Sequence, residues 1–294
     1  MTSPLSTIGE SPRSDCPSVD AGRIAGCVGV ILAGGLGTRL RPVLGDLPKA
    51  LAPVRGRPFL AYQLDWLKGQ GVTRVVLCTG YGHELIQATF GDGTSLGMQI
   101  LHSVEEKPLG TAGALQQARH YLHEAFLTMN GDTYFDTDLS ALLAHHREGG
   151  APATLALVKV PQAGRFGAVT LDARGYVIRF AEKERHRAGL VNAGIYVFEP
   201  EIFGRFPDRV PLSLEDDVFP ALAAQRLLRG DLLEGYHMDI GTPESYAQFQ
   251  KDVAATASRH PLGEAAIATA SRVFRGAASR HPPGEKDMHL GLVR

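Results

Sequence analysis

An apolar run that ends abruptly in a glycine-rich turn constrains this chain more than any other feature. The run Val30–Ala33 is followed at residues 34–42 by Gly-Gly-Leu-Gly-Thr-Arg-Leu-Arg-Pro. Glycines allow a backbone to approach a polyphosphate closely and to present its N–H groups. The cations Arg39, Arg41 and Lys49 come soon after the run, and such side chains neutralise phosphate charge. The pattern predicts a nucleoside triphosphate site at the carboxyl end of a parallel strand.

Two other glycine motifs do not fit this turn. A dinucleotide fingerprint needs three glycines in G-x-G-x-x-G spacing. Gly35 and Gly37 match the first two positions, but Leu40 stands at the third. A Walker A loop needs Gly-Lys-Ser/Thr, whereas Gly37 is followed by Thr-Arg. The turn therefore predicts neither a nicotinamide-type domain nor a P-loop.

The first half of the chain predicts an α/β fold. Strand-like apolar runs alternate with segments of helical periodicity, which is typical of a doubly wound, mostly parallel sheet with right-handed crossovers. Ligands bind such sheets outside the carboxyl ends of the strands, where the glycine turn, Glu105 and Asp132 all fall. The predicted strands are 27–33, 73–79, 98–102 and 125–130, and the predicted helices are 59–67, 83–90 and 112–122.

The second half is richer in strand patterns, and we interpret it as a β-rich extension of the same sheet rather than a separate domain. Residues 1–25 and 255–294 lack periodicity and are rich in small and polar residues. We expect both segments to be disordered around a folded unit of residues 26–254. The predicted strands are 153–160, 167–171, 176–181 and 194–198, and the predicted helices are 215–228 and 243–253.

Two acids complete a pattern that suits a divalent cation. Asp132 follows the predicted strand 125–130, and Asp239 ends another strand-like run just before the Gly-Thr-Pro that begins the last helix. Mg²⁺ usually takes one or two protein carboxylates together with substrate phosphates. Alone, Asp132 fits a turn aspartate equally well. The second carboxylate favours a metal site.

Together these motifs resemble those of the sugar-1-phosphate nucleotidyltransferases, G-G-x-G-[ST]-R-[LM] followed by P-K-[AP], and the resemblance spans roughly residues 28–253. It implies that Asp132 and Asp239 hold one Mg²⁺ ion. It also implies that Arg39 holds the β- and γ-phosphates, while Lys49 and Lys183 flank the α-phosphate and the sugar phosphate. The residues that it implies bind the nucleotide are Leu32, Ala33, Gly34, Gly35, Gly37, Thr38, Arg39, Gly110 and Thr111.

The resemblance also assigns a sugar side, in the β-rich half. Residues 180–184 read Phe-Ala-Glu-Lys-Glu, similar to the family's F-x-E-K-P except for the last position. Glu182 is thereby implied to accept hydrogen bonds from sugar hydroxyls and Lys183 to contact the sugar phosphate. Two further motifs, Arg-Phe-Gly and Asn-Ala-Gly-Ile-Tyr, imply that the N–H of Gly167 and the side chain of Asn192 face the sugar.

The base side is expected in the turn at residues 103–113, which contains Glu105 and Glu106. Guanine presents two adjacent donors, N1–H and the 2-amino group, which one carboxylate can accept, whereas uracil and thymine present one N–H between two carbonyls. A glutamate here favours GTP; alternatively, both acids point to solvent. Within the family the chain is most similar to guanylyltransferases acting on heptose or mannose 1-phosphate. Such enzymes make GDP-heptose or GDP-mannose, with pyrophosphate, for cell-surface polysaccharides.

Two other functions stay open: a uridylyltransferase acting on a sugar 1-phosphate such as N-acetylmuramate 1-phosphate, and a non-catalytic regulatory subunit that binds nucleotide-sugar. The second would be expected to have lost a residue such as Lys49 or Asp132, and both are present.

Bulk properties add few restrictions. The formal net charge of −1 shows no basic excess for nucleic acid. No apolar stretch approaches a membrane span or a signal core. The 3 cysteines form no C-x-x-C pattern. We therefore expect a cytoplasmic protein, and the sequence leaves open whether it forms a homo-oligomer.

Overall fold

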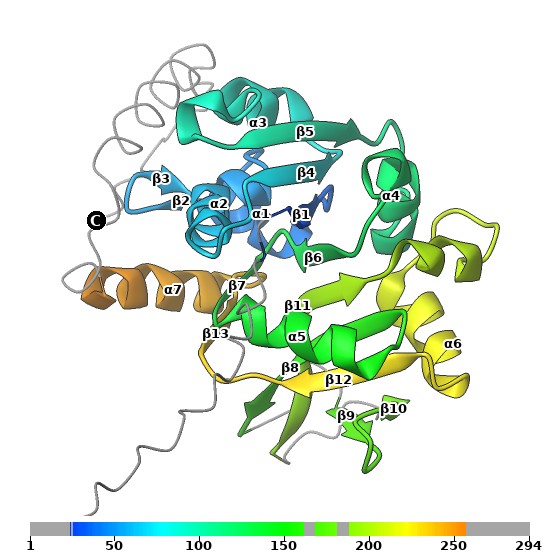
Figure 1. The fold of residues 1–294 in the computed structure, drawn as a ribbon. Helices are drawn as coiled ribbons and strands as arrows, with labels where there is room; N and C mark the ends of the chain where they lie inside the picture. Colours follow the sequence, from blue (N-terminus) through cyan, green and yellow to red (C-terminus); the bar gives the residue numbers. More distant parts are fainter. Residues whose placement is uncertain (1–23, 25, 162–167, 181–187, 257–294) are drawn as a thin grey trace, which may run out of the picture.

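The computed structural model describes residues 24, 26–161, 168–180 and 188–256. One nine-stranded sheet runs through this part of the chain, and helices cover both of its faces (Figure 1). The strand order is β10-β9-β11-β6-β1-β4-β5, with β8 joined to β11 and β12 joined to β8. Its strands are β1 (Val28–Ala33), β4 (Arg74–Thr79), β5 (Gln99–Val104), β6 (Phe126–Asn130), β8 (Ala153–Val160), β9 (Ala168–Leu171), β10 (Val177–Phe180), β11 (Gly189–Phe198) and β12 (Leu228–Leu232).

The sheet is parallel where the glycine turn was predicted to bind phosphate. β1 pairs in parallel with both β4 and β6, and β4 pairs in parallel with β5. The other half is mixed, because β11 runs antiparallel to β6, β8 and β9. The fold is therefore the predicted α/β fold, with the β-rich second half continuing the same sheet.

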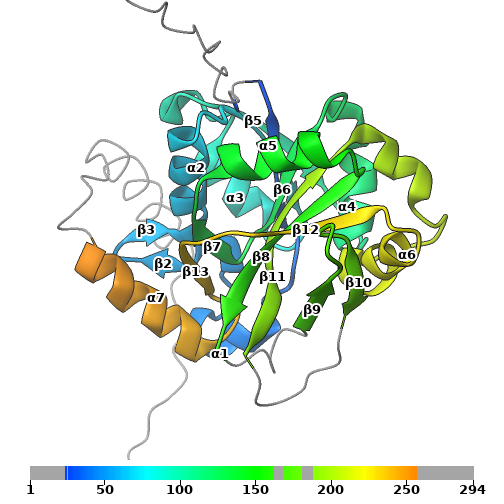
Figure 2. The same ribbon diagram turned by 60° about the horizontal axis from the view of Figure 1, so that its bottom comes forward.

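Helices lie on both faces of the sheet. Buried side chains of α2, α3 and α5 share one apolar cluster with the sheet, and those of α4 and α6 share a second. Figure 2 shows α5 lying across β8, β11 and β12, in agreement with its contacts. The helices are α1 (Arg41–Leu44), α2 (Phe59–Gly69), α3 (His83–Phe90), α4 (Thr111–Ala118), α5 (Leu139–Gly149), α6 (Phe219–Ala224) and α7 (Pro243–Thr256), with 3₁₀ turns at 38–40, 49–51, 94–96, 119–121 and 200–205.

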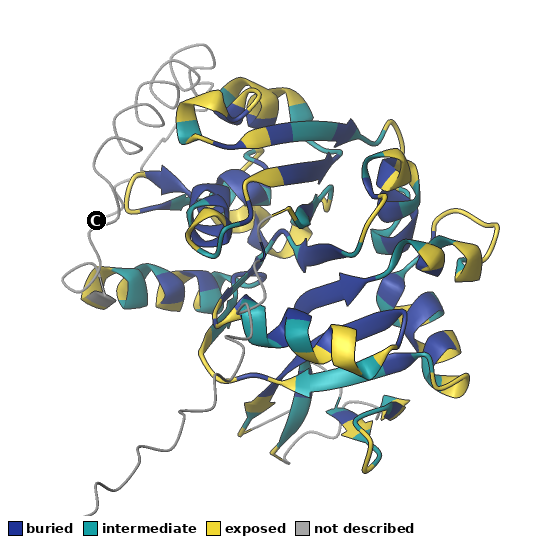
Figure 3. Cartoon of the chain, viewed as in Figure 1, coloured by how far each residue is buried: buried dark blue, intermediate teal, exposed yellow. Residues whose placement is uncertain are grey.

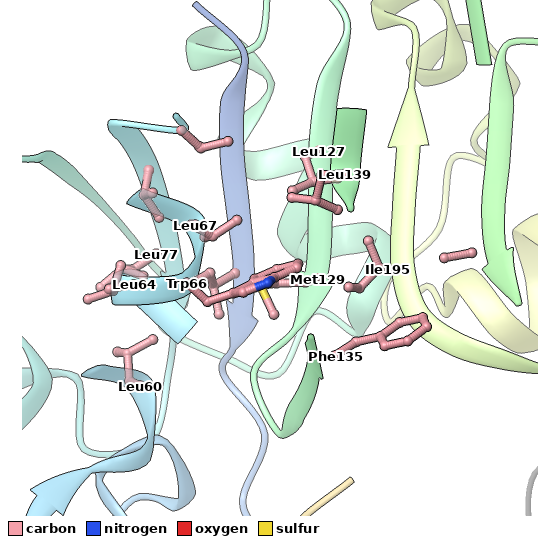
Figure 4. Packing of buried hydrophobic residues seen from close by; sticks show 14 of the residues in the cluster. Leu60, Leu64, Trp66, Leu67, Leu77, Leu127, Met129, Phe135, Leu139 and Ile195 are labelled. Atoms are coloured by element: carbon pink, nitrogen blue, oxygen red, sulfur yellow. The ribbon is translucent and has the colours of Figure 1, made fainter. Parts of the chain in front are cut away.

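Alternation along the strands divides the core into these two clusters. On β1, Ile31 joins the cluster with α2, and Val30 joins the cluster with α4. On β6, Met129 and Phe126 divide in the same way. Burying one such side chain fully contributes about 1.5–3 kcal/mol. Figure 4 shows the first cluster between α2 and the sheet, and Figure 3 shows the central strands almost wholly buried.

Two small antiparallel pairs lie beside the main sheet. β7 (Thr133–Asp136) pairs with β13 (Tyr236–Asp239), and β2 (Pro53–Val54) pairs with β3 (Arg57–Pro58). A third apolar cluster centred on Phe249 of α7 packs against this region. The β7–β13 pair is functionally important, because it places Asp239 next to the end of β6.

Several predicted boundaries need correction. The predicted helix 215–228 extends too far at its end: the π-turn (Leu214–Val218) and α6 end at Ala224, and β12 begins at Leu228. Arg226 has φ of +57°, a left-handed conformation that ends a helix. The prediction also missed α5, although Asp138 accepts a hydrogen bond from the N–H of Ser140 as its N-cap. The strand predicted from residue 194 begins at Gly189, with a register shift at 192–196.

The terminal segments predicted to be disordered, 1–25 and 255–294, lie outside the described residues except for Ile24, Ala255 and Thr256. Their disorder stays a prediction. None of the helices in the described part of the chain is both long enough and apolar enough to cross a membrane.

Candidate active site

A pocket of about 290 Å³ opens at the carboxyl ends of β1 and β6. Nine of the residues that line it are among those predicted from the sequence: Leu32, Ala33, Gly35, Gly37, Thr38, Arg39, Lys49, Thr111 and Asp132. The remaining lining residues are Ala50, Asn130, Gly131 and Gly241. The structure thus brings the glycine turn, one predicted metal ligand and two predicted phosphate-binding cations into one cavity.

The glycine turn folds tightly against Lys49. Gly37 has φ of +59°, and a Cβ added to it would lie 3.1 Å from the Cβ of Lys49. Any larger residue there would be strained and would displace the lysine. Arg39 follows in the short 3₁₀ turn, and its side chain reaches the pocket wall. Arg41 does not line the pocket and lies over the Tyr81 ring, 5.8 Å from its centroid.

Asp132 is held in the turn between β6 and β7. The N–H of Gly131 donates to the carbonyl of Leu32 at 2.9 Å, so the turn is fixed to the end of β1. A Cβ on Gly131 would be 2.6 Å from that carbonyl oxygen, which no side chain could tolerate. The Asp132 carboxylate accepts a hydrogen bond from the Lys49 ammonium group. The acid and the cation therefore converge from segments far apart in the sequence.

Asp239 reaches the same place through the β7–β13 pair. It is opposite Thr133 in the register, and the N–H of Ile240 donates to the Asp132 carbonyl at 2.9 Å. A Cβ built on Gly241 would lie 2.6 Å from Asp239 Oδ1, 3.0 Å from Arg39 Nη2 and 3.3 Å from Lys49 Nζ. Two carboxylates and two cations therefore share one small volume.

The electrostatics of this cluster suit a cation between the acids. Burial, and then the nearby charge of Asp132, raise the pKa of Asp239, while Lys49 and Arg39 oppose the shift. Two hard carboxylate groups that repel each other are the donor set that Mg²⁺ takes together with phosphate oxygens. Within the described residues no group of three or more His, Cys, Asp or Glu side chains could hold a metal on its own.

Gln63 on α2 is a supporting residue that the sequence interpretation missed. Its side chain is fully buried, and Nε2 donates to the carbonyls of Asn130 at 2.9 Å and Thr133 at 2.7 Å. These two carbonyls flank Asp132 along the chain. Gln63 therefore fixes the turn that presents this carboxylate. The available signal was a polar residue within the apolar helix 59–67.

We predict that Gln63→Leu raises the metal concentration needed for half-maximal activity about tenfold, as other changes around metal ligands do. The variant leaves two buried carbonyls without donors and lets the Asp132 turn move. Gln70→Leu is the matched control, because Gln70 donates to the Thr137 carbonyl at 3.2 Å from the end of the same helix. Metal titrations should separate the two variants, and equal metal requirements would contradict this role for Gln63.

The predicted base-side acids lie beside the pocket rather than in its wall. The Glu105 carboxylate accepts a hydrogen bond from the N–H of Leu109 at 2.9 Å and packs against Gly34. Burial raises the pKa of Glu105. Glu106 is exposed. Gly110, with φ of +78°, presses against the backbone of Leu212. Contact of these residues with a nucleotide stays a prediction.

On the sugar side the structure places one of the four predicted residues. Asn192 on β11 accepts a hydrogen bond from the N–H of Gly194 at 2.9 Å and donates to the Tyr196 hydroxyl at 3.0 Å. Gly167, Glu182 and Lys183 lie outside the described residues.

Sequence reasoning did not select Asn130, whose amide oxygen is buried at the pocket and has no hydrogen-bond partner within the described structure. Its signal was its place two residues before Asp132.

Residues 28–256 match the model of a family described as nucleotidyl transferase. The chain belongs to this family. D-glycero-alpha-D-manno-heptose 1-phosphate guanylyltransferase from Campylobacter jejuni is 37% identical to this nucleotidyltransferase over 223 residues, 75% of the chain and 97% of the relative. Mannose-1-phosphate guanylyltransferase from Mycobacterium tuberculosis is 39% identical over 228 residues, 76% of this chain and 64% of the relative.

Solved structures agree with this assignment. HddC from Yersinia pseudotuberculosis, complexed with GMP-PN, superposes with a TM-score of 0.68 at 31% identity. The match covers 77% of this chain and 99% of HddC. The family prediction made from the glycine turn and the two aspartates is therefore confirmed.

Proposed function

We propose that this nucleotidyltransferase joins GTP to a sugar 1-phosphate, giving a GDP-sugar and pyrophosphate. The observation that carries the proposal is a pocket lined by Arg39, Lys49 and Asp132. Asp239 lies beside Gly241 of its wall. Its curated relatives are named for guanylyl transfer to heptose 1-phosphate and mannose 1-phosphate. A GDP-heptose or GDP-mannose type of product for polysaccharide synthesis is accordingly the one we infer.

The chemistry requires positioning and charge stabilisation rather than a general base. The phosphate oxygen of a sugar 1-phosphate is already ionised, so it can attack the α-phosphorus of GTP directly. The protein has to bring two anions together and stabilise the charge that develops in the transition state. Arg39 would hold the β- and γ-phosphates that leave as pyrophosphate, and Lys49 would neutralise the reacting phosphates. Lys183, outside the described residues, is assigned to the sugar phosphate by resemblance alone.

Nucleotidyltransferases of this family generally use a divalent metal. We propose Mg²⁺, with Asp132 and Asp239 as its protein ligands, because their shared volume and mutual repulsion fit a hard cation. Bound there, the ion would supply Lewis-acid stabilisation of the phosphate oxygens. The Lys49–Asp132 hydrogen bond would then orient the carboxylate and the ammonium group toward the same phosphates.

We predict that GTP is preferred over UTP, dTTP, CTP and ATP. The proposed reader is the carboxylate of Glu105, which packs against Gly34 of the glycine turn and accepts the N–H of Leu109. We propose that it also accepts the two donors of guanine. An unsatisfied donor pair in a partly buried site costs about 1–3 kcal/mol, so the preference in kcat/KM should be about tenfold to a hundredfold. Because burial raises the pKa of Glu105, its protonation should weaken GTP binding at a higher pH than an ordinary glutamate would.

Glu105→Gln should reduce the preference for GTP, because an amide accepts through one oxygen only and adds a competing donor. Glu106→Gln is the matched control one residue along, at an exposed position. Equal kcat/KM for GTP and UTP in the unmodified enzyme would contradict the guanine assignment and favour the uridylyltransferase alternative.

A matrix of nucleoside triphosphates against sugar 1-phosphates, read by pyrophosphate release, tests the whole proposal. Release with GTP and a heptose or mannose 1-phosphate is the expected result. Absence of release with every pair would favour the non-catalytic alternative.

We also propose a cytoplasmic location, since the thiols of Cys27 and Cys78 are free and burial raises the pKa of each, as suits reduced, unreactive residues.

A further inference from the structure

A chain of hydrogen bonds runs behind the pocket from α4 to β11, and Glu215 stands at its centre. Glu215 lies in the π-turn at residues 214–218, a segment that does not line the pocket. One carboxylate oxygen accepts from the Thr111 hydroxyl at 2.8 Å, and the other from the Tyr196 hydroxyl at 3.4 Å. Thr111 is in the pocket wall, and Tyr196 is fully buried in the core behind it.

The direction of each hydrogen bond shows that the centre must be an acceptor at both ends. The Thr111 hydroxyl already accepts from the N–H of Leu214 at 2.7 Å, so its own hydrogen is directed to Glu215. The Tyr196 hydroxyl already accepts from the amide of Asn192 at 3.0 Å, so its hydrogen is also directed to Glu215. A carboxylate can accept both, whereas an amide would place a donor against one of the hydroxyls.

These hydrogen bonds through Glu215 fix side chains on the two sides of the site. Thr111 begins α4, and the 212–215 segment holds that helix start in place through the Leu212 carbonyl, which accepts from the N–H of Ala112 at 2.9 Å. On the other side, Asn192 is held at both ends of its amide, by Gly194 and by Tyr196. Its Nδ2 group therefore has a defined direction and one remaining hydrogen.

We propose that Glu215 is a positioning residue that couples the nucleotide side of the pocket, through Thr111, to the sugar side, through Tyr196 and Asn192. This inference rests on the proposed function, because it assigns the two ends to two substrates. Glu215 itself does not line the pocket. Burial holds the pKa of Tyr196 far above its usual value, so this hydroxyl stays protonated and remains a donor.

The test compares Glu215→Gln, Tyr196→Phe and the control Asp216→Asn by steady-state kinetics for each substrate. The amide introduced by Glu215→Gln would keep its oxygen on the nearer partner, Thr111, and lose the longer bond to Tyr196. We therefore expect this variant to raise KM for the sugar 1-phosphate about tenfold, with a smaller change in KM for GTP. Tyr196→Phe removes one hydroxyl from the same arm and should give the same sugar-side defect.

Asp216 is the neighbouring acid on the same turn, exposed and bonded to Ser213, so its substitution should leave both KM values unchanged. KM values for both substrates within twofold of wild type in Glu215→Gln and Tyr196→Phe would overturn the coupling. A loss of melting temperature with unchanged KM values would assign Glu215 to fold stability alone. If Glu215→Gln does not fold, Tyr196→Phe tests the sugar arm by itself.

A readout without turnover separates this inference from the proposed function. The NMR signal of the Asn192 side-chain amide can be assigned by its loss in Asn192→Asp. This signal should shift in both Glu215→Gln and Tyr196→Phe. An unchanged signal in both variants would overturn the coupling through Glu215, even if the enzyme is active. A different outcome would be that the Asn192 signal shifts in both variants while the wild-type chain releases no pyrophosphate with any pair of substrates. That outcome would contradict the proposed function and leave the coupling through Glu215 standing.

Discussion

Replacing Asp132 or Asp239 by asparagine should lower metal-dependent turnover by about three orders of magnitude, because each change removes one of two anionic ligands and exposes the phosphates to mutual repulsion. The fold should persist, since Asp132 lines the pocket, Asp239 lies beside Gly241 of its wall, and neither side chain belongs to an apolar cluster. Asp136→Asn is the matched control, an exposed acid on β7. Pyrophosphate release at limiting Mg²⁺ is the measurement.

The same pair predicts a pH dependence with a definite sign. Burial and the charge of Asp132 raise the pKa of Asp239, so protons compete with the metal over a wider acid range than for an ordinary aspartate. Apparent Mg²⁺ affinity should therefore fall as pH falls through this raised pKa. Asp132→Asn removes one cause of the shift, and the residual metal binding of that variant should persist to lower pH. Activity of either variant near wild type would remove that acid from the site.

How the two aspartates meet illustrates what sequence reasoning can and cannot provide. Each acid is predictable as a strand-end residue, because an apolar run followed by Gly-Asp or Asp-Ile-Gly is a local pattern. Their proximity depends on the pairing of β7 with β13, two four-residue strands about a hundred residues apart in the chain. Short strands carry little periodicity, so only the family resemblance linked them in advance.

The supporting residues were harder to find for the same reason. Gln63 is one of several polar residues among the apolar residues of α2, so the sequence pattern alone did not distinguish it. Its value comes from two main-chain carbonyls near residue 132, which a helical pattern cannot show. Glu215 was absorbed into a predicted helix that the structure divides into a π-turn and α6. Local sequence patterns predicted the strands of the parallel half of the sheet well. They could not predict the roles of side chains such as these, because those roles depend on tertiary contacts.

Removing either cation of the pocket should have an effect of similar size to loss of an aspartate. Lys49→Ala and Arg39→Ala should each lower kcat by about a hundredfold to a thousandfold, because transition-state charge on the phosphates loses a fixed, preorganised partner. Lys49→Ala also leaves Asp132 without the cation that it contacts. Lys49→Arg keeps the charge in a different shape and should recover only part of the activity.

Arg41→Ala is the matched control for both substitutions, because Arg41 belongs to the same glycine-rich segment but lies over Tyr81 outside the pocket. It should leave kcat within about twofold, as surface substitutions usually do. Single-turnover measurements at saturating GTP distinguish binding from chemistry. If Lys49→Ala and Arg39→Ala raised only KM for the sugar 1-phosphate, with kcat and GTP kinetics intact, their assignment to the triphosphate would be wrong. If Arg41→Ala matched them, the phosphate site would include the whole segment rather than the two cations that converge on the aspartates.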